Sequence, residues 1–197
     1  MTPNIGSVQP FPILTPAEYL VWEEKQAQKH EYIDGQIYAM SGGSVNHGRI
    51  GIRLTTLLES HLQDGTCIPG NSDVKIRIPH SQNYTYPDAS ATCDKRDRET
   101  PDYFTYPCLI IEVLSPGTEA YDRGGKFRLY RQNPVLKDYL LVSSTSIEAD
   151  LYSQDDLGQW RLFNYRSGDI IILQSLNLSF SLDDLYRGLT LANPQAP

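Results

Sequence analysis

The chain contains 197 residues, of which 40% are hydrophobic and 21% charged, and this composition predicts one folded domain with a sizeable core. No apolar run approaches the roughly 18 residues that a membrane-spanning helix needs, and the N-terminus lacks the basic and apolar regions of a secretory signal. The net charge of −7 argues against broad affinity for nucleic acids, because phosphate binding depends largely on Lys and Arg. It does not exclude a nuclease, since a catalytic pocket can itself be acidic and basic residues can cluster locally.

The cysteines bear on the compartment of the protein. Cys67, Cys93 and Cys108 are odd in number and have no C-x-x-C spacing. Such a pattern is typical of reduced thiols in a cytosol, where structural disulfides are rare. We therefore expect three free thiols and a cytoplasmic protein.

Local signals along the chain predict alternating helices and strands. Thr15 and Glu18 form a capping box that starts a helix, and Asp34-Gly35 is a hairpin turn signal. The Gly124-Gly125 pair weakens one expected helix, since each glycine costs about 1 kcal/mol relative to alanine. The expected elements, in chain order, are a helix at 16–28, strands at 30–34 and 36–40, a helix at 47–63, strands at 74–78, 86–92 and 109–114, a helix at 118–132, strands at 139–142, 147–152, 160–165 and 170–173, and a short helix at 182–186.

This order of elements predicts a mixed α/β (α+β) fold around one central β-sheet that is flanked by helices, with β-hairpins toward the C-terminus. We expect a single domain over 15–190. A flexible, proline-rich arm at 1–14 precedes it, and a short tail at 191–197 follows it.

A carboxylate within the most apolar stretch of the chain is the first candidate for chemistry. Glu112 lies inside the run 109–114, which is typical of a buried strand, and a lone charge there costs several kcal/mol unless it is protonated, paired or bound to a cation. Asp88 opens the preceding expected strand. If the two strands adjoin, the carboxylates can lie about 4–6 Å apart, within reach of one Mg²⁺ or Mn²⁺ ion that the Val113 carbonyl also binds.

Several motifs, taken together, resemble known nucleases. Pro87-Asp88 followed by Glu112 in an apolar strand resembles the PD-(D/E)xK pattern of restriction-endonuclease-like proteins. A larger set, over roughly 15–188, resembles the Uma-two family of endonucleases in order and spacing. This set is His30-Glu31-Tyr32-Ile33-Asp34-Gly35, His47-Gly48-Arg49, Tyr86-Pro87-Asp88, Ile111-Glu112-Val113-Leu114-Ser115-Pro116, and Lys126 with Tyr130. The resemblance implies a restriction-endonuclease-like core and magnesium-dependent cleavage of nucleic acid, with DNA as the expected substrate.

One residue departs from the general pattern. Leu114 stands where a lysine is expected two residues after the acid, and in the Uma-two pattern a lysine from the following helix substitutes. Lys126 occupies that position here, and Lys75 is a second candidate because its strand would adjoin that of Asp88. If neither amine reaches the metal, the domain binds without cutting.

The resemblance also extends to residues outside the two strands. Glu31 matches the position of an extra acid that could join the catalytic group or the metal. His47 could contact phosphate or cap its helix, and Arg123 and Tyr130 are further candidates for contacts with substrate.

Three functions remain open at this point. The first is a Mg²⁺-dependent endonuclease, and a homodimer is expected if it cuts both strands of a duplex. The second is a catalytically inactive module of the same fold that binds nucleic acid or protein. The third is a structural domain in which Glu112 forms only a buried ion pair, for example with Lys126 or Arg128.

Overall fold

The computed structural model describes residues 11–191. Most of the predicted arm at 1–14 and nearly all of the tail at 191–197 lie outside these residues. The helices are α1 (Pro16–Glu23), α2 (Val45–Leu62), α3 (Lys95–Arg98), α4 (Glu119–Tyr121), the π-helix η1 (Asp122–Lys126), α5 (Phe127–Tyr130), the 3-10 helix η2 (Gln174–Leu176) and α6 (Leu182–Tyr186). The strands are β1 (His30–Ile33), β2 (Gln36–Ala39), β3 (Ile68–Asn71), β4 (Lys75–Arg77), β5 (Tyr84–Thr85), β6 (Ala89–Thr92), β7 (Tyr103–Phe104), β8 (Pro107–Leu114), β9 (Asp138–Ser143), β10 (Glu148–Gln154), β11 (Trp160–Arg166), β12 (Ile170–Leu173) and β13 (Leu178–Ser181).

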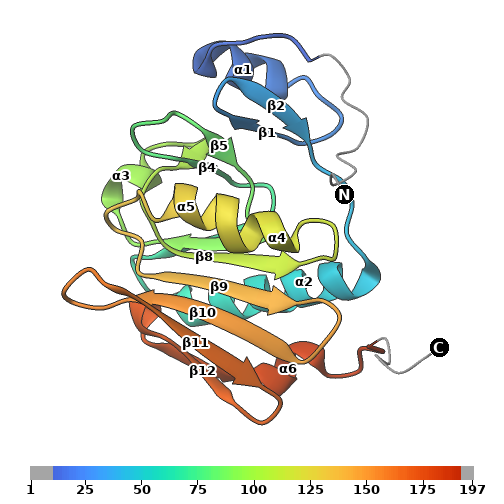
Figure 1. Ribbon diagram of the computed structural model, residues 1–197. Coiled ribbons are helices and arrows are strands. Elements are labelled where there is room, and N and C mark those ends of the chain that lie inside the picture. The colour runs from blue at the N-terminus through green and yellow to red at the C-terminus, as the bar shows by residue number, and fades with distance from the viewer. Residues whose placement is uncertain (1–10, 192–197) are drawn as a thin grey trace.

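A mixed six-stranded sheet forms the centre of the molecule, with the strand order β11-β10-β9-β8-β6-β3 (Figure 1). Strand β8 pairs with β9 in parallel and with β6 in antiparallel orientation. It is the apolar run predicted from the sequence, and it is buried along nearly its whole length because helices cover both faces of the sheet. The expected neighbour relation between the strands of Asp88 and Glu112 is therefore confirmed.

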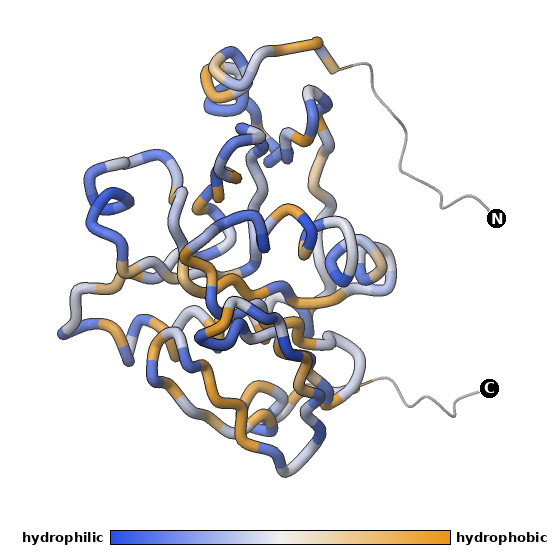
Figure 2. Tube along the Cα trace, turned by 60° about the vertical axis from the view of Figure 1, so that its left-hand side comes forward, coloured by the Kyte–Doolittle hydropathy of each residue, from blue (hydrophilic) through white to orange (hydrophobic). Residues whose placement is uncertain are grey.

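The two faces of the central sheet carry separate cores. On one face, the apolar stripe of α2 packs with Ile111 and Val113 of β8 and with the C-terminal strands and α6. On the other face, Ile110 and Leu114 of β8 pack with α5 and with residues of β4 and β9. Hydrophobic segments run through this lower body of the molecule in Figure 2. Glu112 falls between these two residues in the two-residue repeat of the strand, so it faces the α5 side.

A second, five-stranded sheet with the order β2-β1-β5-β4-β7 carries the N-terminal part of the chain. The hairpin of β1 and β2 turns at Asp34-Gly35, as predicted, with positive φ at both residues. Helix α1 begins with the predicted capping box of Thr15 and Glu18, and it packs Tyr19 against Tyr32 of β1. This lobe places β1 next to the face of the central sheet that carries Glu112.

Several elements differ from the sequence-based prediction. The described residues form three sheets rather than one. The expected strands β1, β2 and β4 form a separate sheet with the unpredicted short strands β5 and β7, and the expected β12 pairs only with the unpredicted β13. Helix α1 ends at Glu23 instead of residue 28. The expected helix at 118–132 is broken into α4, η1 and α5, and the π-turn spans the glycine pair that weakened the prediction.

The prediction of three free thiols is wrong for two of them. A disulfide joins Cys67 and Cys93, which are 26 residues apart and lie opposite each other just beyond the paired ends of β3 and β6. Antiparallel pairing brought them together, and no local spacing motif marks such a pair in the sequence. Cys108 is a free thiol.

None of the helices within residues 11–191 combines the length and apolar character that a membrane crossing requires.

Candidate functional site

Glu112 is a buried carboxylate held by two donors. Its Oε1 atom accepts hydrogen bonds from Lys126 Nζ at 3.1 Å and from the Tyr130 hydroxyl at 3.0 Å. Only 3% of Glu112 is exposed. Burial raises the pKa of Glu112 well above its usual value, and it outweighs the opposite effect of the Lys126 ammonium. The ion pair of Glu112 with Lys126, on which the third possible function depends, is present in the structure. Even beside Lys126, the ionised form of Glu112 remains disfavoured by burial.

Lys126 lies among three carboxylates. Its Nζ atom is 3.1 Å from Glu31 Oε1, 3.1 Å from Glu112 Oε1 and 3.6 Å from Asp122 Oδ1. Burial disfavours the charged form of Lys126, but these carboxylates hold its pKa well above the usual value. Lys126 is therefore an ammonium ion in a buried position, at the end of the π-helix η1.

Asp88 directly precedes β6 and interacts with the end of β8. Its Oδ2 atom accepts a hydrogen bond of 2.6 Å from the Val113 backbone N–H and lies 3.4 Å from His47 Nε2. A hydrogen bond with Asp88 raises the pKa of His47, and a backbone hydrogen bond with Val113 adds to this effect, while burial opposes it. His47 belongs to the first turn of α2, so three separate segments meet at this point.

Glu31 connects the N-terminal lobe to the central sheet. Besides contacting Lys126, its Oε1 atom accepts a hydrogen bond of 3.1 Å from the backbone N–H of Tyr86, two residues before Asp88. Glu31 is buried. Of the four residues predicted to be catalytic, Lys126 contacts both Glu31 and Glu112. Asp88 contacts the backbone N–H of Val113, the residue after Glu112.

Asp122 joins this acidic cluster but was not predicted. It is 3% exposed, and burial raises its pKa. The four-residue spacing between Asp122 and Lys126 was a usable signal, because residues at that spacing share one side of a helix. We refer to Glu31, Asp88, Glu112, Asp122 and Lys126 as the acidic cluster.

Other predicted site residues lie differently. Arg123 points to Glu119 and to Asp150 of β10, with which it forms ion pairs. Tyr130 is fully buried and donates its hydroxyl to Glu112, so it can hold that side chain in place, and its contact with substrate stays a prediction. Lys75 lies over the Tyr86 ring, 5.7 Å from its centroid, and Lys126 is the amine that contacts Glu112.

The donor set of the acidic cluster suits a hard cation better than a soft one. It contains four carboxyl groups against one ammonium and the His47 imidazole, so oxygen donors are in excess. Within residues 11–191, no three His, Cys, Asp or Glu side chains converge closely enough to hold a metal by themselves. Magnesium needs fewer, because it commonly takes one or two carboxylates and completes its shell with water. Asp88, Glu112 and the Val113 carbonyl are compatible with that requirement.

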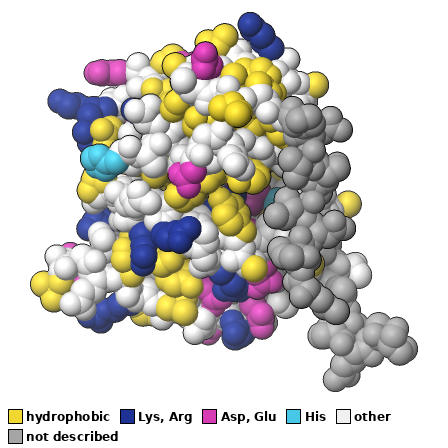
Figure 3. Space-filling view, turned by 45° about the horizontal axis from the view of Figure 1, so that its top comes forward, with side chains coloured by type: hydrophobic (Ala, Val, Ile, Leu, Met, Phe, Trp, Pro, Cys, Tyr) yellow, Lys and Arg dark blue, Asp and Glu magenta, His cyan; other side chains and the backbone are white. Residues whose placement is uncertain are grey.

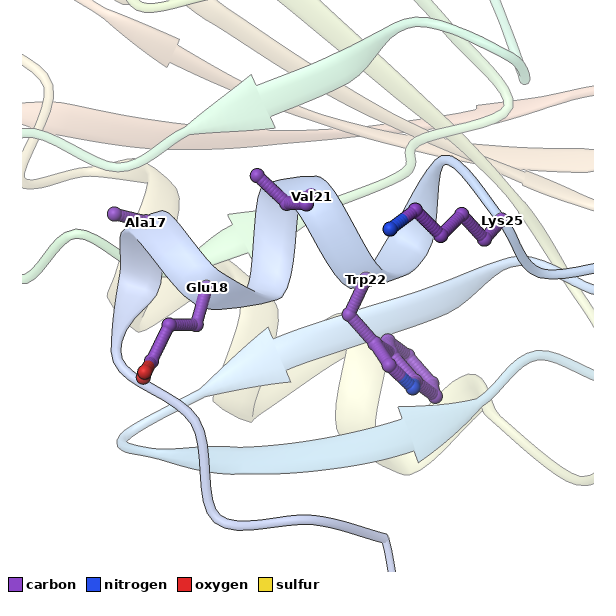
Figure 4. Close-up of a pocket in the computed structure, with 5 residues that line it drawn as sticks. All are labelled: Ala17, Glu18, Val21, Trp22 and Lys25. Atoms are coloured by element: carbon purple, nitrogen blue, oxygen red, sulfur yellow. The ribbon is translucent and has the colours of Figure 1, made fainter.

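Two surface features of residues 11–191 lie apart from the acidic cluster. The hollow in Figure 4 lies along α1 and is lined by Ala17, Glu18, Val21, Trp22 and Lys25, none of which belongs to the acidic cluster. On the face shown in Figure 3, Lys and Arg side chains are scattered and form no continuous patch.

Comparison with known proteins places the chain in a family. A family model described as "putative restriction endonuclease" matches residues 16–185, which is most of the chain. The chain belongs to the Uma2 family. The predicted resemblance is thereby confirmed, and the acidic cluster lies entirely within the matched region.

The chain is also similar to two further proteins and to one solved structure. Two uncharacterized proteins of Synechocystis are similar to the chain: slr1290 is 62% identical over 91% of this chain and 95% of its own length, and sll1609 is 36% identical over 76% and 86%. A crystal structure from Anabaena variabilis, described as a putative nuclease belonging to DUF820, superposes with a TM-score of 0.72. It covers 88% of this chain and 98% of its own at 16% identity, and so confirms the predicted mixed α/β fold.

Proposed function

We propose that this Uma2 protein is a metal-dependent endonuclease that hydrolyses phosphodiester bonds of nucleic acid. The observation that supports the proposal is the contact of Lys126 with both Glu31 and Glu112, with Asp88 bound to the backbone N–H of Val113, the residue after Glu112. Buried carboxylates in excess over cations are costly to fold, and such clusters are commonly retained for function.

Asp88, Glu112 and the Val113 carbonyl would hold the metal, with Mg²⁺ as the expected ion and Mn²⁺ as a substitute. The oxygen donors fit these hard cations. When bound, the metal supplies a bound water of lowered pKa and positive charge against the phosphate.

The protein's own residues prepare this position. Lys126 Nζ supplies a fixed positive charge beside Glu31 and Glu112, and it favours the extra negative charge that develops on a phosphate during hydrolysis. The Tyr130 hydroxyl fixes the orientation of Glu112, and the Val113 N–H fixes that of Asp88. His47 contacts Asp88 and can donate a hydrogen bond there from its ring nitrogen.

Nucleic acid is the substrate class that this proposal implies, with DNA as the expected form. If the protein cuts both strands of a duplex, two active sites are needed, and a symmetric homodimer is the simplest way to provide them.

A cleavage assay tests the proposal directly. The purified protein is incubated with plasmid DNA and with single-stranded DNA and RNA, in the presence of Mg²⁺, Mn²⁺ or EDTA. We expect cleavage with either metal and none with EDTA. Asp88→Asn and Glu112→Gln should each abolish it, because each removes one metal ligand charge.

Glu119→Gln is a matched control. Glu119 lies on α4, one helical segment before Lys126, but it pairs with Arg123 outside the acidic cluster. This variant should cleave like the unchanged protein. Undiminished cleavage by both Asp88→Asn and Glu112→Gln would contradict the assignment of the site.

An inactive binding module is a second candidate, favoured by the position of Lys126. Its ammonium already lies between Glu31 and Glu112, where it partly neutralises them without a metal. Calorimetric titration with Mn²⁺ separates the two functions, since a module with a purely structural cluster would bind no ion through Asp88.

A further inference from the structure

Two exposed tyrosines border the acidic cluster, and the first is Tyr38 on β2. It pairs directly with Glu31 in the antiparallel register of β1 and β2. Directly opposed residues of such a pair project on the same face of the sheet, so Tyr38 lies beside Glu31 on the side that faces Lys126. Tyr38 is 43% exposed.

The second tyrosine, Tyr121, is the last residue of α4. It directly precedes Asp122, and its ring lies against Gly125, where an added Cβ would be 2.4 Å from two ring carbons. The ring is thus seated on the backbone of the π-helix, next to Lys126. Burial raises the pKa of Tyr121 to about 12, and the nearby Glu31 carboxylate adds to the shift, which agrees with this position. Tyr121 nevertheless remains 41% exposed.

Their exposure sets these two rings apart, because every other tyrosine of residues 11–191 is buried or half-buried. Many of those tyrosines pack against another ring, as in the pairs of Tyr19 with Tyr32 and of Tyr130 with Tyr139. Within residues 11–191, neither Tyr38 nor Tyr121 takes part in such a pair. An unpaired aromatic face beside a phosphate-cleaving site is suited to stack on a nucleobase.

The charge of the protein argues against an intact duplex as the preferred ligand. A duplex carries about twice the phosphate charge of a single strand per unit length. The net charge of −7 and the scattered basic side chains on the face in Figure 3 therefore disfavour a duplex more than a single strand. Stacking on a tyrosine requires a base that is free of its helical neighbours, which a single strand, flap or frayed end provides.

We propose that Tyr38 and Tyr121 bind the bases next to the cleaved phosphate, and that the substrate is therefore a single strand or an unpaired segment of nucleic acid. This inference rests on the proposed nuclease function, and it assigns Tyr38 and Tyr121 as the residues that select the substrate class.

The test measures binding and cleavage separately. A short fluorescent single strand and a blunt duplex of the same sequence are titrated with the protein, with Ca²⁺ in place of Mg²⁺, and binding is followed by anisotropy. The variants are Tyr121→Ala, Tyr38→Ala and Tyr121→Phe. Phe163→Ala serves as the matched control, because Phe163 is an aromatic residue of similar exposure, 43%, on the far edge strand β11.

We expect the single strand to bind more tightly than the duplex. Each alanine variant should weaken single-strand binding by about fivefold or more, because stacking is worth about 1–3 kcal/mol per base. Tyr121→Phe keeps the ring and should stay within about twofold of the unchanged protein, as should Phe163→Ala. The loss should persist when the salt concentration is raised, since stacking is not screened by ions.

Tighter binding of the duplex, or unchanged single-strand binding by both alanine variants, would overturn the inference. Failure of the nuclease proposal gives a different result: no strand is cut with Mg²⁺, while the dependence of binding on both tyrosines still appears. Tyr121→Ala could disturb the π-helix, so its unfolding is compared with that of Tyr121→Phe, and a loss of binding counts only when both variants remain folded.

Discussion

Glu112 combines good hydrogen bonding with poor charge balance. Lys126 and Tyr130 both donate to it, yet Asp122, Asp88 and Glu31 act on it with the same sign of charge. Burial makes this repulsion stronger than it would be in water. A buried carboxyl group surrounded by other carboxyl groups stabilises the fold less than a neutral residue of the same shape would, and the difference in the free energy of unfolding can be measured.

Glu112→Gln should raise the free energy of unfolding by about 1 kcal/mol or more in EDTA at neutral pH. Glutamine keeps an oxygen for Lys126 and Tyr130, and Lys126 retains Glu31 and Asp122 as partners. The raised pKa of Glu112 gives the direction of the pH dependence. Below the usual value of 4.5, Glu112 is protonated in both the folded and the unfolded state. At higher pH the unfolded chain loses this proton first, which lowers the free energy of unfolding of the unchanged protein. The advantage of the variant should therefore vanish near about pH 4.

Urea unfolding with and without Mg²⁺ provides the measurement. Mg²⁺ should stabilise the unchanged protein by mass action and leave Glu112→Gln unaffected, because the variant lacks a ligand charge. A purely structural ion pair predicts the reverse, namely a destabilised variant and no response to metal in either protein.

The residues of the cluster were predictable to different degrees. Glu112 could be found by physical reasoning, since a charge within an apolar strand is costly, and Asp88 follows from its place at the start of the preceding strand. Glu31 and Lys126 came from the family resemblance, because nothing local links β1 to a helix almost a hundred residues later. Asp122 was not predicted, although its spacing to Lys126 was visible, because its burial depends on the π-turn of η1, which helix propensity does not indicate.

At the scale of elements, the π-helix η1 decides which side chains face inward. Its wider turn buries Asp122 and Lys126 together and leaves Arg123 to pair with Asp150 on β10. The glycine pair indicated a weak helix, but sequence propensity does not distinguish a broken helix from a widened one. The π-turn depends on packing over β8, which only the fold supplies.

The two glycines of η1 should respond in opposite ways to alanine. Nothing lies within 4 Å of a Cβ added at Gly124, so Gly124→Ala should be neutral or stabilise by up to about 1 kcal/mol. A Cβ at Gly125 would lie 2.4 Å from the Tyr121 ring, so Gly125→Ala must displace that ring and should cost about 1–3 kcal/mol.

Thermal and urea unfolding of the two variants, compared side by side, check this difference. Equal stability of both would mean that the Tyr121 ring does not rest on Gly125. Gly125→Ala should also weaken single-strand binding, whereas Gly124→Ala should not, which connects the shape of this element to the selection of substrate.

At the scale of the whole molecule, long-range pairing limited what the sequence could predict. Long, strongly patterned elements such as α2, β8 and the β1–β2 hairpin were found near their true positions. The short strands β5 and β7 have two residues each, and they become strands only because neighbours in the five-stranded sheet pair with them. The disulfide has the same origin, since β3 and β6 must pair before Cys67 can meet Cys93.

The disulfide closes a loop across 26 residues, and a loop of this length restricts the unfolded chain enough to be worth about 3 kcal/mol. The variant Cys67→Ala/Cys93→Ala should lose about that amount of unfolding free energy. Both cysteines are replaced because Cys108 Sγ lies 3.7 Å from Cys93 Sγ, so a single change at Cys67 would leave a second partner in reach.

Cys108→Ala is the control and should change stability by less than about 1 kcal/mol, since its thiol takes no part in the crosslink. Reductant should lower the stability of the unchanged protein to that of the double variant and leave the double variant itself unaffected. Three titratable thiols in the oxidised protein, together with no effect of reductant, would show that the edge strand β3 is held by backbone pairing alone.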